Sequence, residues 1–202
     1  MTTTESMTPD RIWHAVATER TTLHALLTTL SEDQWNHESL CDSWRIRDVV
    51  AHIILSADPT FSALLIGLIR ARGNLHAMIR DTAIRHARQS TTADLLTQLH
   101  ATINHRTTPP GTTPADRLMD LLVHGQDIAI PLGLPREIPT PAAQVALDRI
   151  CHAGTFGIRK TLTTHRLIAT DTTWTAGTGH PLEAPIATLL LFATGREQPH
   201  KQ

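Results

Sequence analysis

The stretch Asp116–Gly133, DRLMDLLVHGQDIAIPLG, carries the most informative pattern in the chain. Read as an α-helix, it places four polar residues on one stripe: Asp116, Asp120, His124 and Asp127. Apolar side chains occupy most of the remaining circumference, which is typical of a helix packed on several sides. Three carboxylates and an imidazole there indicate either a solvated stripe or a built polar site, and this helix alone leaves both open.

A second helix is predicted over Ser43–Ser56, SWRIRDVVAHIILS. Ser43 is the expected N-cap, and Asp48 is favourably placed near the helix N-terminus. His52 lies in the middle of an almost unbroken apolar run. A lone histidine in such a run is more often a hydrogen-bonded core residue than a metal ligand.

Two helices that each carry an imidazole among apolar residues favour a different interpretation. His52 from one helix, with Asp120 and His124 spaced i, i+4 on the other, can supply three ligands on converging faces and leave a coordination position open. Such an open position is typical of a catalytic metal site rather than a closed structural one. The Asp-x-x-x-His pattern by itself is common by chance.

The order of several segments resembles the DinB-like superfamily and, more narrowly, the actinobacterial mycothiol-dependent maleylpyruvate isomerase family. WRIRDVVAHI (Trp44–Ile53) is followed some 70 residues later by DLLVHGQDIAIPLG (Asp120–Gly133). The middle of the chain (Ala71–Leu99) and its tail (Leu167–Arg196) are also similar to short members of that family. The resemblance therefore covers nearly the whole chain.

This resemblance implies a mostly α fold, with a DinB-like four-helix bundle, additional C-terminal helices and a small β-hairpin. It also implies a divalent metal held by His52, Asp120 and His124, with zinc expected before nickel or manganese. Mycothiol would be the thiol co-substrate. The isomerases commonly carry Glu at the Asp120 position, so a shorter carboxylate must reach the metal here. Full-length isomerases are also expected to carry a larger C-terminal domain that this chain is too short to contain.

Asp127 lies three residues beyond His124 on the same helix face. It is placed either to orient that imidazole or to act as a base, because histidine ligands commonly donate their other ring N–H to a carboxylate or a carbonyl. A helix-end cap or an ion pair with an arginine is the structural alternative, and the pattern leaves both open. Cys41 and Cys151 lack any nucleophile motif, and their small apolar neighbours indicate structural thiols.

Composition bounds the remaining possibilities. The chain has 202 residues, and its net charge of −1 predicts no binding to nucleic acid or to an anionic membrane. No apolar run reaches the ~20 residues of a membrane span, and two cysteines are too few for a disulfide framework. We therefore expect a cytoplasmic protein with one domain over residues 8–198 and a disordered segment over residues 1–7. The resemblance to DinB-like proteins implies a homodimer as one oligomeric form, and the sequence leaves the oligomeric state open.

Breakers and periodicity divide the chain into elements. A loop is expected over Ser31–Asp42, pinned to the bundle by Trp35 and Trp44, and a hairpin around Asp171 with a turn at Gly177–Gly179. Helices are expected over Thr8–Thr29, Ser43–Asp58, 60–72, 74–87, Ser90–Asn104, Pro114–Pro131, Ala142–Gly154 and Pro185–Thr194. Arginines make residues 70–88 basic, which favours a solvated helix face over a substrate-carboxylate site.

Three functional hypotheses follow. The first is a metal-dependent transferase or isomerase that uses mycothiol to conjugate or isomerise a small electrophile. The second is a metal-dependent hydrolase or lyase in which metal-bound water replaces the thiolate. The third is a DinB-like protein that binds a small molecule without turnover.

Overall fold

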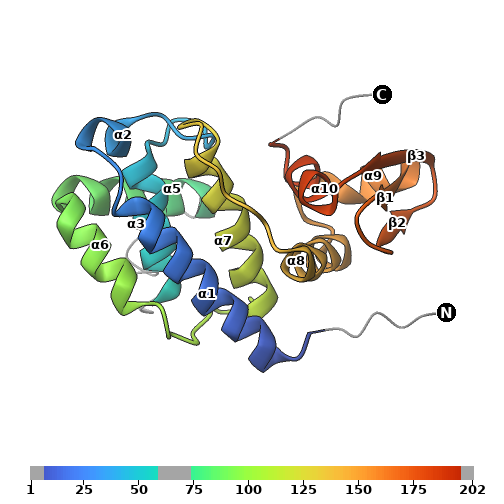
Figure 1. Cartoon of the computed structure of the whole chain (residues 1–202), viewed down its shortest axis with the longest axis horizontal. Helices are drawn as coiled ribbons and strands as arrows, with labels where there is room; N and C mark the ends of the chain where they lie inside the picture. The colour runs from blue at the N-terminus through green and yellow to red at the C-terminus, as the bar shows by residue number, and fades with distance from the viewer. Residues whose placement is uncertain (1–6, 59–73, 197–202) are drawn as a thin grey trace. The chain divides into compact units, whose positions relative to one another are not determined.

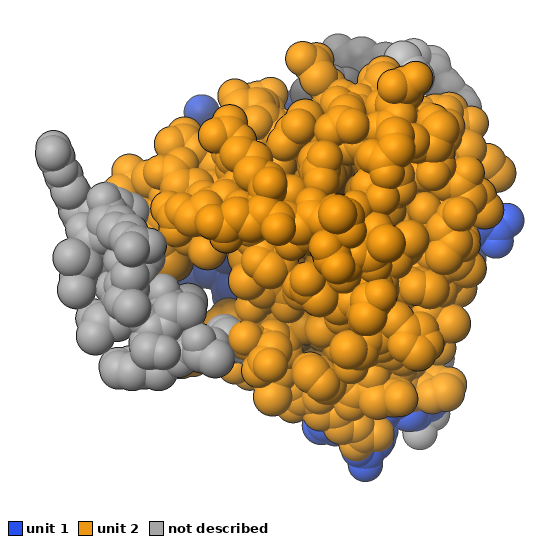
Figure 2. Space-filling view, turned by 90° about the vertical axis from the view of Figure 1, so that its left-hand side faces the viewer, with its two compact units in different colours: residues 1–12, 137–202 blue, residues 13–136 orange. Residues whose placement is uncertain are grey.

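The computed structural model describes residues 7–58 and 74–196. The chain splits into two compact units, residues 13–136 and residues 137–202 together with 1–12, which Figure 2 shows in different colours. The predicted single domain over residues 8–198 stays a prediction. Of the predicted disordered segment only Met7 is described, and the predicted helix over residues 60–72 lies outside the described residues.

Helices build the unit of residues 13–136. They are α1 (Pro9–Leu27), α2 (Glu32–Asn36), α3 (Ile46–Ala57), α5 (Leu75–Gln89), α6 (Thr92–Ala101) and α7 (Pro114–Ala129). The central helix is α3, which packs against α5, α6 and α7 (Figure 1). Its apolar run is buried accordingly, as the near-continuous hydrophobic pattern predicts. The mostly α class expected from the sequence is confirmed.

Carboxylates three residues inside the helices fix where α3 and α7 begin. Asp48 accepts the backbone N–H of Arg45 at 2.9 Å, and Asp116 accepts that of Thr113 at 2.7 Å. Arg45 rather than Ser43 is therefore the N-cap of α3, which corrects the predicted helix start. Ser43 instead has a left-handed backbone with φ of +64°, an uncommon conformation for a residue with a side chain.

The predicted loop over Ser31–Asp42 contains the short helix α2, so this expectation is wrong in its first half. Ser31 and Gln34 form a reciprocal capping box, in which Gln34 accepts the Ser31 N–H at 2.9 Å. The S-x-x-Q pattern that encodes it was present in the sequence. Trp35 and Trp44 are both buried, as predicted.

The second unit combines helices with a small sheet. Its elements are α8 (Thr140–Ala153), a 3₁₀ turn (Thr155–Gly157), α9 (Ile158–Thr164), β1 (His165–Ala169), β2 (Thr175–Gly177), β3 (His180–Ala184) and α10 (Ile186–Ala193). Strands β1 and β2 form the predicted antiparallel hairpin. The sequence reading missed α9 and also β3, which pairs in parallel with β1 and gives the order β2-β1-β3. Pro181 is tolerated in β3 because that strand lies at the sheet edge.

No helix among the described residues is long and apolar enough to cross a membrane.

Candidate metal centre

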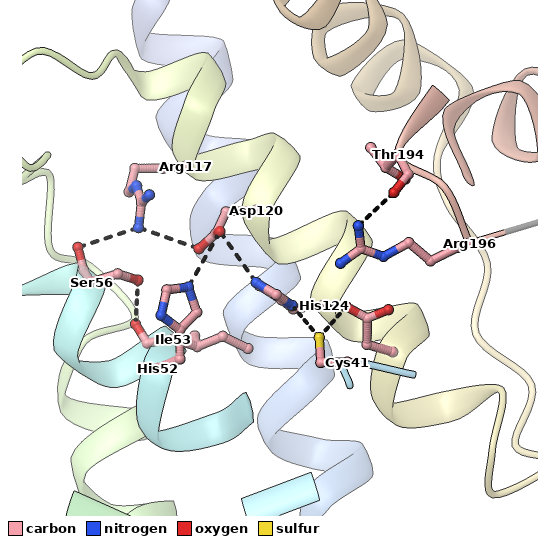
Figure 3. Close-up of polar contacts among 10 residues, drawn as sticks. Cys41, His52, Ile53, Ser56, Arg117, Asp120, His124, Thr194 and Arg196 are labelled. Atoms are coloured by element: carbon pink, nitrogen blue, oxygen red, sulfur yellow. Dashed lines mark hydrogen bonds and ion pairs between the residues drawn. The ribbon is translucent and has the colours of Figure 1, made fainter. Parts of the chain in front are cut away.

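The structure brings together the three residues that the sequence singled out as ligands. His52 extends from α3, and Asp120 and His124 extend from successive turns of α7 (Figure 3). Oδ1 of Asp120 lies 3.5 Å from Nε2 of His52 and 3.4 Å from Nε2 of His124. The side chains keep 15%, 17% and 13% of their surface exposed for His52, Asp120 and His124. A small molecule or ion can therefore reach them.

These separations fit a metal better than a direct hydrogen-bond network. They are longer than the 2.7–3.2 Å of good N–H···O bonds. Zinc with bonds of about 2.1 Å to nitrogen and oxygen places neighbouring tetrahedral ligands about 3.4 Å apart. The donor set of two imidazoles and one carboxylate, in which each offers one atom to a common space, therefore suits a divalent cation.

The polar stripe on α7 divides into residues with different tasks. Asp116 caps the helix N-terminus, Asp120 and His124 face the cluster, and Asp127 is fully buried. The solvated-stripe interpretation is therefore wrong for Asp127. Its Oδ2 accepts a hydrogen bond from Nδ1 of His124 at 2.9 Å, which leaves Nε2 of that ring to face His52 and Asp120.

Arg117 engages the other side of the Asp120 carboxylate. One guanidinium nitrogen lies 3.4 Å from Oδ2 of Asp120 and donates at 3.4 Å to the backbone oxygen of Ser56. The carboxylate thus presents Oδ1 to the two histidines and Oδ2 to a buried cation. The sequence reading did not single out Arg117, although its i, i+3 spacing from Asp120 is a usable signal.

Neighbouring groups in the cluster shift the pKa values of Asp120 and His124 in opposite directions. Burial would raise the pKa of Asp120, but the imidazoles of His52 and His124 hold that pKa well below its usual value. Burial would lower the pKa of His124, but Asp120, Asp127 and Cys41 together raise it well above the usual value. Without a metal, Asp120 and His124 therefore form an ion pair, and the proton on Nε2 of His124 occupies the position that a cation would take.

Trp44 forms an aromatic wall against the cluster. Its ring centroid lies 5.4 Å from that of His52 and 6.3 Å from that of His124, and it stacks on His124 with an interplanar angle of 26°. The sequence reading assigned Trp44 only to anchoring the preceding loop. The indole also limits the orientations open to both imidazoles and shields one side of the cluster from water.

Cys41 does not have the small apolar neighbours that the sequence predicted for it. Its Sγ lies 3.0 Å from Oδ2 of Asp127 and 3.6 Å from Nδ1 of His124, so its neighbours are polar and belong to the site. Figure 3 shows Cys41 beside His124. No local sequence motif signals this contact, because Cys41 and His124 are 83 positions apart. Cys41, His124 and Asp127 form a second group of candidate metal donors that shares His124 with the first.

A deeper arginine supports the bundle beneath the cluster. Arg20 on α1 is 2% exposed and donates to the backbone oxygens of Thr102 and His105 at 2.7 and 2.8 Å. Burial and the nearby charge of Arg117 lower the pKa of Arg20 to about 10, and Asp120 opposes this decrease. Of the basic segment 70–88, Arg80 pairs with Asp81 at the surface, and residues 70–73 lie outside the described chain.

Comparison with known proteins points to one family. Residues 16–129 match the family model described as the mycothiol maleylpyruvate isomerase N-terminal domain. A crystal structure of the mycothiol-dependent maleylpyruvate isomerase matches with a TM-score of 0.65 and 15% identity, covering 98% of this chain and 93% of that chain. A histidine-to-alanine mutant of that isomerase matches with the same TM-score at 14% identity. No curated protein matches the chain.

The structural likeness shows a shared fold. It also corrects the expectation that the solved isomerases carry a large C-terminal domain absent here, because 93% of the matched isomerase chain is covered. The unit of residues 137–202 therefore has a counterpart in that structure.

Proposed function

Because the chain belongs to the family of the mycothiol maleylpyruvate isomerase N-terminal domain, we propose that it is a metal-dependent enzyme that uses a low-molecular-weight thiol. The thiol is mycothiol, and the reaction is the conjugation or isomerisation of a small electrophilic substrate. The observation that carries this proposal is the convergence of His52, Asp120 and His124 at 3.4–3.5 Å in a partly exposed cluster.

His52, Asp120 and His124 would hold the cation, with zinc as the expected metal and nickel or manganese as alternatives. A bound divalent cation lowers the pKa of a coordinated thiol and so supplies a nucleophile near neutral pH. Asp120 lies within 3.5 Å of both Nε2 atoms. These separations support Asp120 as the ligand at the position where the family resemblance implies Glu.

The remaining residues would orient the ligands and control the surroundings of the thiol. Asp127 keeps Nδ1 of His124 protonated and so directs the Nε2 lone pair toward the cation. Arg117 fixes the rotation of the Asp120 carboxylate. Trp44 covers one side of the two imidazoles and keeps water away from it. In this proposal the reacting sulfur comes from the co-substrate, and the Cys41 thiol donates a hydrogen bond to Asp127.

A metal-dependent hydrolase or lyase is the second candidate. The same three donors leave an open coordination position, which activates water as readily as it accepts a thiolate. The 13–17% exposure of the ligands permits water to reach that position. Dependence on thiol distinguishes the two candidates.

The decisive test combines metal analysis with thiol dependence. We expect purified protein to hold near-stoichiometric metal and His52→Ala and His124→Ala to lose it, whereas His152→Ala, an exposed histidine on α8, retains it. Mycothiol should raise the melting temperature of the metal-loaded protein and be required for turnover of electrophiles such as maleylpyruvate. Wild-type protein that stays metal-free after incubation with zinc, nickel and manganese would overturn the proposal. Thiol-independent turnover would favour the hydrolase.

A further inference from the structure

The loop that carries Cys41 is hydrogen-bonded to α7 at the backbone carbonyl of Asp127. In an α-helix the Asp127 carbonyl would accept the N–H of residue 131, but that residue is Pro131 and has no N–H. The N–H of Leu40 donates to this carbonyl instead, at 3.1 Å. The proline that ends the helix thus leaves an acceptor to which the loop attaches.

Within the loop, Ser39 sets the position of Cys41. The Ser39 hydroxyl accepts the Cys41 N–H at 3.1 Å and donates to the backbone oxygen of Trp44 at 2.9 Å. The backbone of Cys41 is therefore held on both sides, by Leu40 bonded to α7 and by Ser39 bonded to the segment before α3. Its thiol is directed at the Asp127 carboxylate by this framework rather than by a flexible side chain.

One carboxylate oxygen receives both donors at this point. Oδ2 of Asp127 accepts the thiol of Cys41 at 3.0 Å and Nδ1–H of His124 at 2.9 Å. Asp127 is fully buried, and a buried carboxylate needs its hydrogen bonds because water cannot replace them. A change in Cys41 therefore acts on His124 through the carboxylate that both share and through the 3.6 Å contact between Sγ of Cys41 and Nδ1 of His124.

We infer that Cys41 is a positioning residue for the metal centre, an inference that rests on the proposed function. Its thiol holds the Asp127 carboxylate in the rotation that keeps Nδ1 of His124 bonded and Nε2 directed at His52 and Asp120. The chain of contacts runs from a loop sulfur through Asp127 to a ligand imidazole. No sulfur–metal bond is part of this arrangement.

The distances separate this role from that of a metal ligand. Donor separations of 2.9 and 3.0 Å around Asp127 are hydrogen-bond lengths, whereas the separations around Asp120 are 3.4 and 3.5 Å. Zinc bonds of about 2.3 Å to sulfur and about 2.0 Å to oxygen would hold Sγ of Cys41 and Oδ2 of Asp127 about 3.5 Å apart. Those two atoms lie 3.0 Å apart, although Sγ and Nδ1 of His124 are 3.6 Å apart, so Oδ2 of Asp127 lies at hydrogen-bond distance from both partners, and the Asp120 group is spaced for a cation.

The test compares three substitutions of Cys41 with a control at the other cysteine. Cys41→Ser retains a donor, whereas Cys41→Ala and the near-isosteric Cys41→Val remove it; Cys151→Ala is the control. Zinc affinity is measured by competition with a chelator. We expect the Ala and Val variants to bind zinc about 10-fold more weakly, by analogy with other residues that support metal ligands. Ser should recover most of this loss, and Cys151→Ala should match wild type.

Two spectroscopic measurements make the inference falsifiable. In metal-free protein, the NMR signal of the His124 Nδ1 proton should be protected from exchange in wild type and Cys41→Ser and lost in Cys41→Val. If Cys41 were a ligand, cobalt-loaded wild type would show a near-ultraviolet sulfur-to-cobalt band that is lost in Cys41→Ser. We expect no such band. An unchanged Nδ1 signal in Cys41→Val overturns the inference, and so does such a band, since Cys41 would then be a ligand.

The zinc-affinity and NMR measurements distinguish a failure of the proposed function from a failure of the role assigned to Cys41. Wild-type protein without zinc affinity would defeat the proposed function, while the NMR comparison in metal-free protein would still decide whether Cys41 holds His124. Equal zinc affinity in wild type and Cys41→Val would defeat the role of Cys41 and leave the metal centre intact.

Discussion

The two units of the chain bury polar groups very differently. Among the described residues of the unit 13–136, the buried polar and charged ones are Glu19, Arg20, Asp48, Thr102, Arg117, Gln126 and Asp127. Among the described residues of the other unit, only Thr194 is buried and polar, and its hydroxyl donates to Leu190 on the same helix. Buried charge is therefore concentrated in the unit that holds the candidate metal centre.

The partners of these groups differ in the same way. Arg20 reaches Thr102, 82 positions along the chain, and Arg136 reaches Glu19, 117 positions away. In the second unit, the indole N–H of Trp174 donates to Asp148, 26 positions away. Burying charge lowers stability unless distant partners are brought into place. The comparison indicates that the first unit brings distant partners together to accommodate buried charge, an arrangement that is common where pKa values are tuned for function.

Breaking the Glu19–Arg136 pair should have the largest effect on stability. The two side chains are 2.6 Å apart and nearly buried, so Arg136→Met leaves Glu19 without its cation. We expect the free energy of unfolding at pH 7 to fall by about 3–5 kcal/mol, measured by urea denaturation. The double variant Glu19→Leu with Arg136→Met should recover much of this loss.

The stability loss of Arg136→Met should depend on pH. Burial raises the pKa of Glu19 even with Arg136 present, so the folded state binds this proton more tightly than the unfolded state does. Its contribution to stability therefore falls as pH rises through its folded pKa. Without Arg136 that pKa rises further, and the deficit of Arg136→Met should shrink toward acid pH. A deficit that does not change with pH would contradict this account.

In the second unit, the Cys151 thiol should react slowly with alkylating reagents. Burial, with a smaller contribution from Asp148, raises the pKa of its thiol to about 11. Alkylation of native protein at neutral pH should be about 100-fold slower than in urea, because each pKa unit lowers the thiolate fraction tenfold. The rate should rise as pH approaches 11. The Cys41→Ser background isolates this thiol, and equal rates in native and unfolded protein would refute the prediction.

The smallest effect is expected for a hydrogen bond whose acceptor, Asp148, is exposed, although the Trp174 ring is buried. Trp174→Phe removes the 2.8 Å bond to Asp148, whose side chain can turn to water, so the hydrogen-bond part of the expected loss is about 1 kcal/mol. Asp148→Asn keeps the acceptor and should cost less. Thermal unfolding followed by circular dichroism measures both. A loss for Trp174→Phe as large as that for Arg136→Met would remove the contrast between the two units.

Local chemistry made much of the fold predictable. Helical periodicity placed α1, α3, α5, α6, α7, α8 and α10. The i, i+4 spacing of Asp120 and His124 placed both on one face of α7, their shared apolar context grouped them with His52 as three candidate ligands, and the family resemblance implied the same set. Errors at this level were also local: the capping box at Ser31 and the true N-cap of α3 were encoded in the sequence by patterns four residues long.

What the sequence could not supply was contact between distant segments. Cys41 and Arg20 have no motif, and they acquire their roles only because the loop before α3 and the helix α1 lie against α7 and the end of α6. The parallel pairing of β1 with β3 is likewise non-local, and Pro181 weakens its strand pattern. A sequence determines intrinsic propensity and periodicity, which act over a few residues. Only tertiary packing decides which distant donors share a carboxylate, and therefore which separations fit a proton and which fit a metal.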